Sequence, residues 1–289
     1  MPLDKDNKQR RFEEAATADL VRRRDVDRYW STLFAPAGRR AALLALYAYN
    51  AEIAHIAATT NEPMVGQIRL QWWKDAIELA VPGTRTGNPI ADSLAGAIFE
   101  HDLPKDRLIG MAEARIPEIV GDAPVDIAAL RASLQATQGT VFELAAGILG
   151  SEGELARKAG EHAGLAYGLM QTLRTVPLQA ARRKLMLPLP YLESRGVNIA
   201  FIYRGQTDAS FGGALAELRG AVGRALHQFR TLSPELDPLV WPAFLPLAVI
   251  KPYLRAMAAP AFDPLHTIPT VSPLRQFWRI WRAARRGSL

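Results

Sequence analysis

The chain of 289 residues contains no cysteine. This absence excludes disulfide bonds, cysteine-ligated zinc or iron–sulfur sites and a thiol nucleophile. Long uninterrupted apolar runs are also missing, because residues 41–60 carry Glu52 and His55 and residues 240–250 are too few to span a bilayer. The N-terminal residues mix acids with bases and have no apolar core, unlike a secretory signal or a transit peptide. We therefore predict a cytoplasmic location, with peripheral contact to the inner membrane left open.

Acidic residues are in the minority. The sequence has 35 Lys and Arg against 29 Asp and Glu, and the excess gathers at residues 22–24, 182–184 and 275–286. Such patches suit an anionic lipid, a diphosphate or nucleic acid, or they are simply solvated helix faces. The sequence shows no helix-turn-helix signature and no RNA-binding sheet motif, so we do not expect nucleic acid as a partner.

Apolar residues recur at helical spacing along most of the chain, as in Leu43, Leu46, Tyr47 and Ile53. Proline and glycine mark the breaks, and no alternating strand pattern is present. These features predict an all-α single domain of about ten helices. We assign residues 1–22 to an N-terminal extension and residues 23–289 to the domain. Segments 137–150 and 163–173 are apolar on several sides, which is typical of helices that line a central cavity.

Four short motifs then occur in a known order. They are residues 39–49 (RRAALLALYAY), residues 69–74 (RLQWWK), residues 88–94 (NPIADSL) and the stretch from Gly164 to Pro188. This order resembles the squalene/phytoene synthase family of head-to-head prenyl transferases. The resemblance covers about residues 23–192 and continues weakly to Trp281, and it implies the isoprenoid-synthase helical bundle.

Catalytic members of that family hold Mg²⁺ between two aspartate-rich helical segments, because divalent cations neutralise the charge on a departing diphosphate. Magnesium prefers hard oxygen ligands, chiefly carboxylates. The corresponding positions in this chain carry no acid and fall on Ala54, His55, Ala58, Thr175, Leu178 and Gln179. The resemblance therefore implies a protein that is not an enzyme and has no metal cofactor.

Other acids could supply ligands in place of the lost ones. Glu52 and Glu62 flank the first segment, and Glu143 lies on a helix that is apolar on several sides. Glu52 and His55 have the spacing of a di-metal ligand pair, but the sequence contains no second Glu-x-x-His. We therefore predict no metal site and interpret His55 as a polar residue bound by a neighbour.

Basic residues nevertheless remain after the second segment, where the family enzymes hold diphosphate. They are Arg174, Arg182, Arg183 and Lys184, and Arg40 lies near the start of the first-segment helix. Arginine binds phosphate oxygens in pairs, so these residues suit a pocket for a phosphate, a diphosphate or an anionic lipid head group. The alternative is that residues 182–184 only complement the carbonyls at a helix C-terminus.

The local pattern narrows the resemblance to one branch of the family. The spacing Leu-Arg-x-x-Pro-x(4)-Arg-Arg-x(3)-Leu-Pro over residues 173–188, Asn50-x-Glu52-Ile53-Ala54 and PAFL at residues 242–245 are similar to a non-catalytic branch. That branch assists the assembly of the respiratory NADH dehydrogenase, complex I. The resemblance thus implies subunits or assembly intermediates of that complex as partners.

The C-terminal segment predicts a strongly amphipathic helix. Arg275, Arg279, Arg282 and Arg286 fall on one face, and the opposite arc consists of Leu274, Phe277, Trp278, Ile280, Trp281 and Ala284. Tryptophan beside arginine is typical of a helix that lies in a membrane interface. The alternative is that the apolar arc docks on the bundle.

Three functional hypotheses follow. The first is a catalytically silent assembly or chaperone-like factor for NADH dehydrogenase that also binds an anionic lipid or an isoprenoid phosphate. The second is an active prenyl transferase that uses farnesyl or geranylgeranyl diphosphate, with Mg²⁺ on substitute ligands. The third is a carrier of prenyl diphosphate or lipid that performs no reaction. A fold alone does not decide among them.

Overall fold

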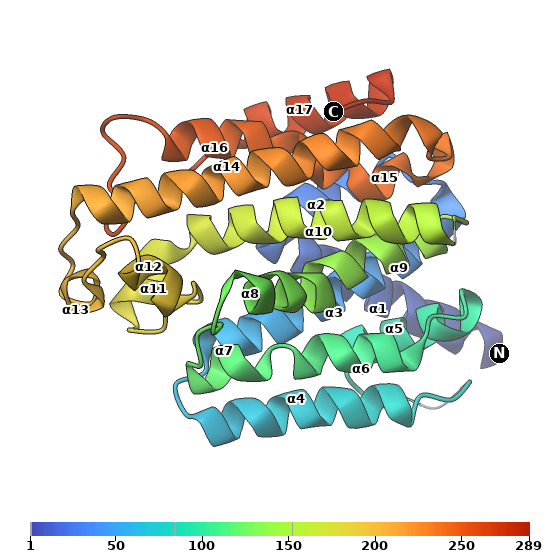
Figure 1. Cartoon of the computed structure of the whole chain (residues 1–289). Coiled ribbons are helices and arrows are strands. Elements are labelled where there is room, and N and C mark those ends of the chain that lie inside the picture. Colours follow the sequence, from blue (N-terminus) through green and yellow to red (C-terminus); the bar gives the residue numbers. More distant parts are fainter. Residues whose placement is uncertain (1, 84, 152) are drawn as a thin grey trace.

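The computed structural model describes residues 2–83, 85–151 and 153–289, with side chains from residue 8 onward, and these ranges contain helices and no strand (Figure 1). The all-α single-domain prediction is confirmed. The expected number of about ten helices is too low, because short helical turns interrupt the connections. The α-helices are α1 (Pro2–Arg24), α2 (Val26–Thr32), α3 (Ala37–Thr59), α4 (Pro63–Glu78), α5 (Pro89–Glu100), α6 (Lys105–Glu113), α7 (Ile116–Val120), α8 (Ile127–Leu134), α9 (Thr140–Ile148), α10 (Glu154–Arg174), α11 (Val176–Ala181), α12 (Leu189–Glu193), α13 (Ile199–Ile202), α14 (Ala209–Leu232), α15 (Trp241–Phe244), α16 (Ile250–Met257) and α17 (Pro273–Arg286).

Four shorter elements complete the chain: the π-helix η1 (Gln135–Gly139) and the 3-10 helices η2 (Ser233–Glu235), η3 (Pro238–Val240) and η4 (Leu245–Val249). Several helices begin where the sequence places proline. Pro63 and Pro89 occupy the first turns of α4 and α5, where a missing N–H costs nothing. The polar side chain of Asp126 accepts a hydrogen bond from Ala129 N (2.7 Å) and caps α8.

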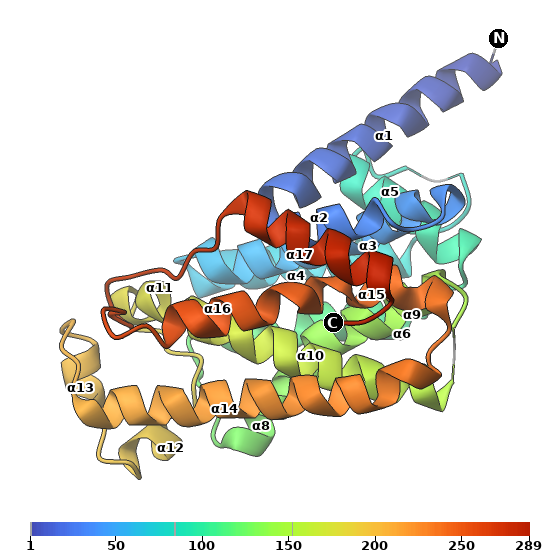
Figure 2. The same ribbon diagram turned by 90° about the horizontal axis from the view of Figure 1, so that it is seen from above.

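Two long helices organise the core. The helix α3 packs against α1, α5 and α9, and α10 packs against α14, α9 and η1 (Figures 1 and 2). The helix α3 is also long and apolar enough to cross a bilayer, but 67% of its most apolar window is buried inside the bundle. Burial of that kind is what a core helix requires, so α3 needs no membrane to cover it.

The approach of α10 to η1 depends on Gly164, which lies against Gly139. A Cβ atom added at Gly164 would lie 2.3 Å from Gly139 Cα, which is far inside van der Waals contact. Both residues are buried. The backbones of α10 and η1 therefore touch directly, and this contact holds the π-helical turn against the centre of the bundle.

The N-terminal helix α1 lies across α3 and α5, and its first turns project beyond the bundle (Figure 2). It buries Thr17, Leu20 and Val21, and the carboxylate of Glu13 pairs with Arg85. Residues 8–22, which we assigned to an N-terminal extension, are thus part of a helix that continues without a break to Arg24.

The last helix α17 packs on η4 and α2, but through an unexpected face. Gln276, Ile280 and Ala283 are buried, whereas Trp278 and Trp281 are 46% and 40% exposed. Docking of the whole apolar arc on the bundle is therefore wrong. Gln276 can be buried although it is polar, because its Nε2 atom donates to Tyr253 Oη (2.8 Å) and to Val271 O (2.7 Å).

Candidate functional site

The first family segment lies on the C-terminal half of α3. Ala54 and His55 are half-buried and Ala58 is exposed. The neighbouring carboxylate of Glu52 accepts a hydrogen bond from Arg24 Nη1 at 2.6 Å. Burial and the charge of Arg24 lower the pKa of His55, so its imidazole is neutral over a wider pH range. The acid nearest to the lost ligand positions is thus already matched by a cation.

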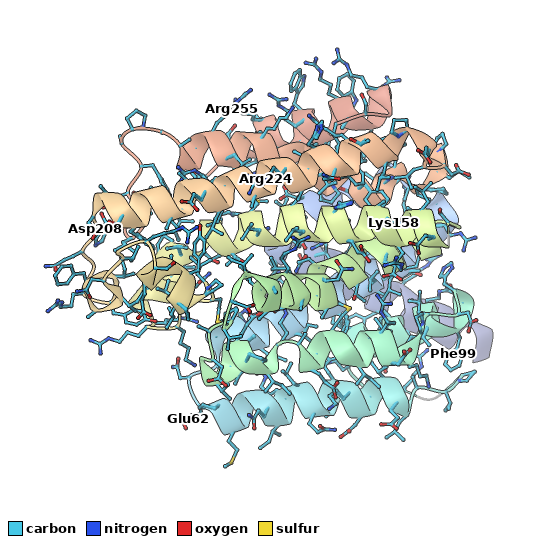
Figure 3. The ribbon with its side chains drawn as sticks, viewed as in Figure 1. Glu62, Phe99, Lys158, Asp208, Arg224 and Arg255 are labelled. Atoms are coloured by element: carbon cyan, nitrogen blue, oxygen red, sulfur yellow. The ribbon has the colours of Figure 1, made fainter. Side chains whose placement is uncertain are left out.

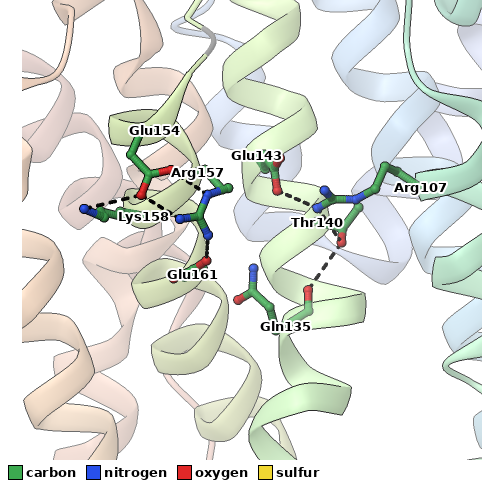
Figure 4. A network of polar contacts seen from close by, with 8 residues as sticks. All are labelled: Arg107, Gln135, Thr140, Glu143, Glu154, Arg157, Lys158 and Glu161. Atoms are coloured by element: carbon green, nitrogen blue, oxygen red, sulfur yellow. Dashed lines mark hydrogen bonds and ion pairs between the residues drawn. The ribbon is translucent and has the colours of Figure 1, made fainter.

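The other substitute acids are placed no better for a metal. Glu62 is exposed at the start of α4 (Figure 3), and Arg107 Nη2 donates to Glu143 Oε2 at 2.5 Å (Figure 4). Within residues 2–83, 85–151 and 153–289, no group of three or more His, Cys, Asp or Glu side chains is arranged to hold a metal ion.

The second segment is a closed hydrogen-bond network at the junction of α10 and α11. Thr175 Oγ1 donates to Gln171 O (3.0 Å), and Gln179 Nε2 donates to Thr175 Oγ1 (2.8 Å) and to Thr172 O (2.9 Å). Gln179 Oε1 accepts from Met186 N (2.8 Å), which ties down the loop after α11. Two neutral side chains thus use their polar atoms on the protein itself, at positions where the family has metal-binding carboxylates.

The five predicted anion-binding residues do not share one location. Arg174 points inward and lies over the Tyr253 ring, 4.5 Å from its centroid. Arg182 and Arg183 are exposed after α11, and Lys184 Nζ donates to Ile119 O (2.8 Å).

Arg40 lies elsewhere. It donates to the carbonyls of Ala35 (2.9 Å) and Leu33 (3.0 Å) at the start of α3, about 20 Å before Ala54 along that helix. The geometry therefore groups Arg182 to Lys184 and separates Arg40 from them. An anion site on the remaining residues stays a prediction.

The middle of the bundle contains a charged side chain that sequence reasoning missed. Arg28 is 1% exposed, and its guanidinium lies over the rings of Tyr47, Phe142 and Tyr167 at 5.4, 5.2 and 4.9 Å from their centroids. These side chains come from α2, α3, α9 and α10 and meet beside the helices that the sequence predicts to line a central cavity. Arginine suits the position because its flat, weakly hydrated group stacks on aromatic faces.

Acids and amides complete this arrangement. Arg28 Nη1 donates to Asp25 Oδ2 (2.7 Å) and Nη2 donates to Gln138 Oε1 (2.8 Å). Tyr167 Oη lies 3.3 Å from Asp27 Oδ2 and donates to it. We call Asp25, Asp27, Arg28, Gln138 and Tyr167 the α2 polar cluster.

Asp27 is the least compensated member of the α2 polar cluster. It is 3% exposed, and its Oδ1 atom has no hydrogen-bond partner. Burial, with the charge of Asp25 as a second cause, raises the pKa of Asp27 to about 7, and Arg174 acts in the opposite direction. A carboxyl of this kind changes its charge near neutral pH.

The one sequence signal for this cluster is the short polar stretch Asp25-Val26-Asp27-Arg28 at the start of the region of family resemblance. Its partners come from η1 and α10, up to 142 residues away. A single sequence does not reveal that proximity.

Comparison with known proteins identifies the family and the fold of the chain. A model of the squalene/phytoene synthase family matches residues 21–281. The chain belongs to the squalene/phytoene synthase family. Two solved structures show the same fold: a dehydrosqualene synthase in complex with ligand (TM-score 0.75, 14% identity, 96% of this chain and 98% of that one) and the squalene synthase HpnC from Alicyclobacillus acidocaldarius (TM-score 0.70, 16% identity, 96% and 95%).

Curated relatives carry a different name from these synthases. The complex I assembly factor 6 of NADH dehydrogenase (ubiquinone) from Homo sapiens and from Bos taurus is 27% identical over 268 residues, which is 91% of this chain and 80% of each relative. A homologue of that factor from Drosophila melanogaster is 24% identical over 270 residues. The predicted family and branch are both confirmed as similarities.

Proposed function

We propose that this chain is a catalytically silent family member that acts in the assembly of respiratory NADH dehydrogenase. The observation that carries the proposal is its similarity to complex I assembly factors over 91% of its length. Subunits or assembly intermediates of the complex are the partners this implies.

The absence of catalysis is supported by the chemistry of the two segments. Alanine offers no ligand, and Thr175 and Gln179 offer neutral oxygens that already take part in hydrogen bonds within the chain. Diphosphate departs readily only when cations neutralise its developing charge. Because this chain has no carboxylates at these positions, it lacks the ligands with which the family enzymes bind those cations.

Deletion and complementation test the assembly role. We expect that cells lacking the gene contain little fully assembled NADH dehydrogenase on native gels, and that the parent chain restores it. Succinate dehydrogenase, measured on the same membranes, controls for a general loss of respiratory enzymes. Normal levels of the assembled complex in the deletion strain would contradict the proposal.

Incubation with diphosphates separates the alternatives. We expect purified protein with farnesyl or geranylgeranyl diphosphate and Mg²⁺ to release no pyrophosphate above the blank, whereas steady turnover would show an active prenyl transferase. The carrier hypothesis predicts thermal stabilisation by these diphosphates without Mg²⁺. Arg182→Ala and Arg183→Ala would weaken that stabilisation if the exposed arginines bind the anion.

A further inference from the structure

A second concentration of cations lies far from the family segments, between α14, α16 and α17. A pocket of about 160 Å³ is bordered there by Arg230, Lys251, Arg279, Arg282 and Arg286, with Leu247, Ala248 and Ala283 among its apolar residues. No Asp or Glu side chain lines it within the described part of the chain. We call these five cations the α17 basic pocket.

The positive charges of the α17 basic pocket outnumber the acidic groups beside them. None of its five cations takes part in an ion pair with an acidic side chain among the residues that the structure describes. Arg230 Nη2 donates to the main-chain oxygen of Leu289 (2.5 Å), the last residue of the sequence, whose terminal carboxylate supplies a single negative charge. The buried Nε atoms of Arg230 and Arg279 have no hydrogen-bond partner. A buried donor without an acceptor is costly, so the pocket favours an anion that brings several oxygens.

Neighbouring cations add to the positive potential. Arg255 projects from α16 on the side of the bundle where α17 lies (Figure 3). Burial and the charges of Arg255, Arg275 and Arg282 lower the pKa of Arg279, and burial with Arg230 and Arg255 lowers that of Lys251. Burial is the larger cause of both shifts, and the neighbouring like charges act in the same direction.

Exposed apolar side chains lie on α17, the helix that also carries three of the five cations of the pocket. Leu274, Trp278 and Trp281 are 84%, 46% and 40% exposed, and we call them the α17 apolar ridge. The guanidinium of Arg282 lies 5.1 Å from the Trp278 ring centroid, and that of Arg285 lies 5.6 Å from the Trp281 centroid. The ridge is fixed in this outward position because Gln276, Ile280 and Ala283 face the bundle instead.

We propose that the α17 basic pocket and the α17 apolar ridge form a docking surface for an anionic phospholipid bilayer. Lipid phosphate groups enter the pocket, and the indole rings lie at the depth of the head groups, where tryptophan is favoured. Each cation near an anionic membrane surface adds to the attraction. A free phosphate would explain the pocket but not three exposed apolar side chains on the same helix. The proposal does not depend on a role in complex assembly, because it needs only the protein and lipid.

Vesicle sedimentation with the full chain tests this surface. We expect binding to vesicles of phosphatidylcholine with about one third phosphatidylglycerol, little binding to phosphatidylcholine alone, and loss of binding at high salt. The double variant Arg282→Glu/Arg286→Glu should weaken binding at least tenfold. Arg131→Glu/Arg224→Glu is the matched control, because both arginines are exposed on α8 and α14 and the net charge changes equally. It should stay within a factor of about two of the parent.

A tryptophan pair separates insertion from simple charge attraction. Trp278→Ser should weaken binding several-fold, whereas Trp72→Ser, which removes a similarly exposed tryptophan from α4, should leave it unchanged. Circular dichroism checks that each variant folds, and Arg282→Gln/Arg286→Gln serves as the milder pair if charge reversal disturbs α17.

The results distinguish the lipid from a soluble anion. Equal binding by the parent and the pocket variants, or no binding to anionic vesicles at low salt, would overturn the proposal. So would a parent chain that inorganic phosphate stabilises at millimolar concentration through Arg282 and Arg286 while it ignores vesicles. Binding that falls in both the pocket and the ridge variants supports the bilayer.

Discussion

The α2 polar cluster and the α17 basic pocket both gather arginine, yet they treat its charge in opposite ways. Inside the bundle, Arg28 has a carboxylate at 2.7 Å, an amide at 2.8 Å and three aromatic rings around it. On α17, five cations face one pocket with no acidic side chain beside them. Removing one member of a buried charge pair destabilises a fold, whereas surface cations that outnumber their counter-charges are available to a partner.

Removal of the buried cation should have the largest effect. Arg28→Met leaves Asp25 without its paired cation and Gln138 without its donor in the bundle interior, so we expect a loss of about 3–5 kcal/mol in the free energy of unfolding. Denaturant titration measures it. Arg279→Met on α17 is the matched variant and should cost less than about 1 kcal/mol. Similar losses in the two variants would erase the contrast between the regions.

The pH dependence of stability provides an intermediate effect. Because the pKa of Asp27 is raised to about 7, the folded state holds this proton where the unfolded chain has lost it. The carboxyl therefore stabilises the fold at acidic pH, and this contribution is lost as the pH rises from about 4 to about 7, by up to 1.4 kcal/mol per unit.

Asp27→Asn should remove that dependence. The stability of the variant relative to the parent should rise between pH 5 and pH 7 and become constant above that range. Thermal unfolding at a series of pH values gives the difference directly, and the shared histidine contributions cancel in it. A difference that does not change with pH would show that Asp27 is ionised throughout.

Removal of a cation from the α17 basic pocket should have the smallest effect, in the opposite direction. Lys251→Gln relieves repulsion from Arg230, Arg255 and Arg279. We expect a gain of at most about 0.5 kcal/mol in low salt that disappears near 0.5 M salt, where such repulsion is screened. A clear loss of stability would mean that Lys251 has a partner within the fold.

The sequence was sufficient for the all-α class of this fold, but not for its short helices or its internal contacts. Proline at residues 63 and 89 and the helical period place the helices, because both act locally. The docking face of α17 could not be predicted from periodicity, because periodicity registers only hydrophobicity. Gln276 is polar, yet its hydrogen bonds to Tyr253 and Val271 allow it to be buried.

The candidate site divides in the same manner. The loss of carboxylates at Ala54, Ala58 and Thr175 is visible in the sequence, since the family motif fixes the positions. The α2 polar cluster is not visible, because Asp25 and Tyr167 meet only when α2 and α10 pack together. The α17 basic pocket likewise needs Arg230 and Lys251 from other helices.

The amide of Gln179 has a consequence for how this protein responds to its surroundings. Its side chain hydrogen-bonds both to Thr172 O on α10 and to Met186 N, and it thereby holds the segment that follows α11. These hydrogen bonds involve a neutral amide and no bound ion. We therefore expect the position of this segment to be independent of the magnesium concentration.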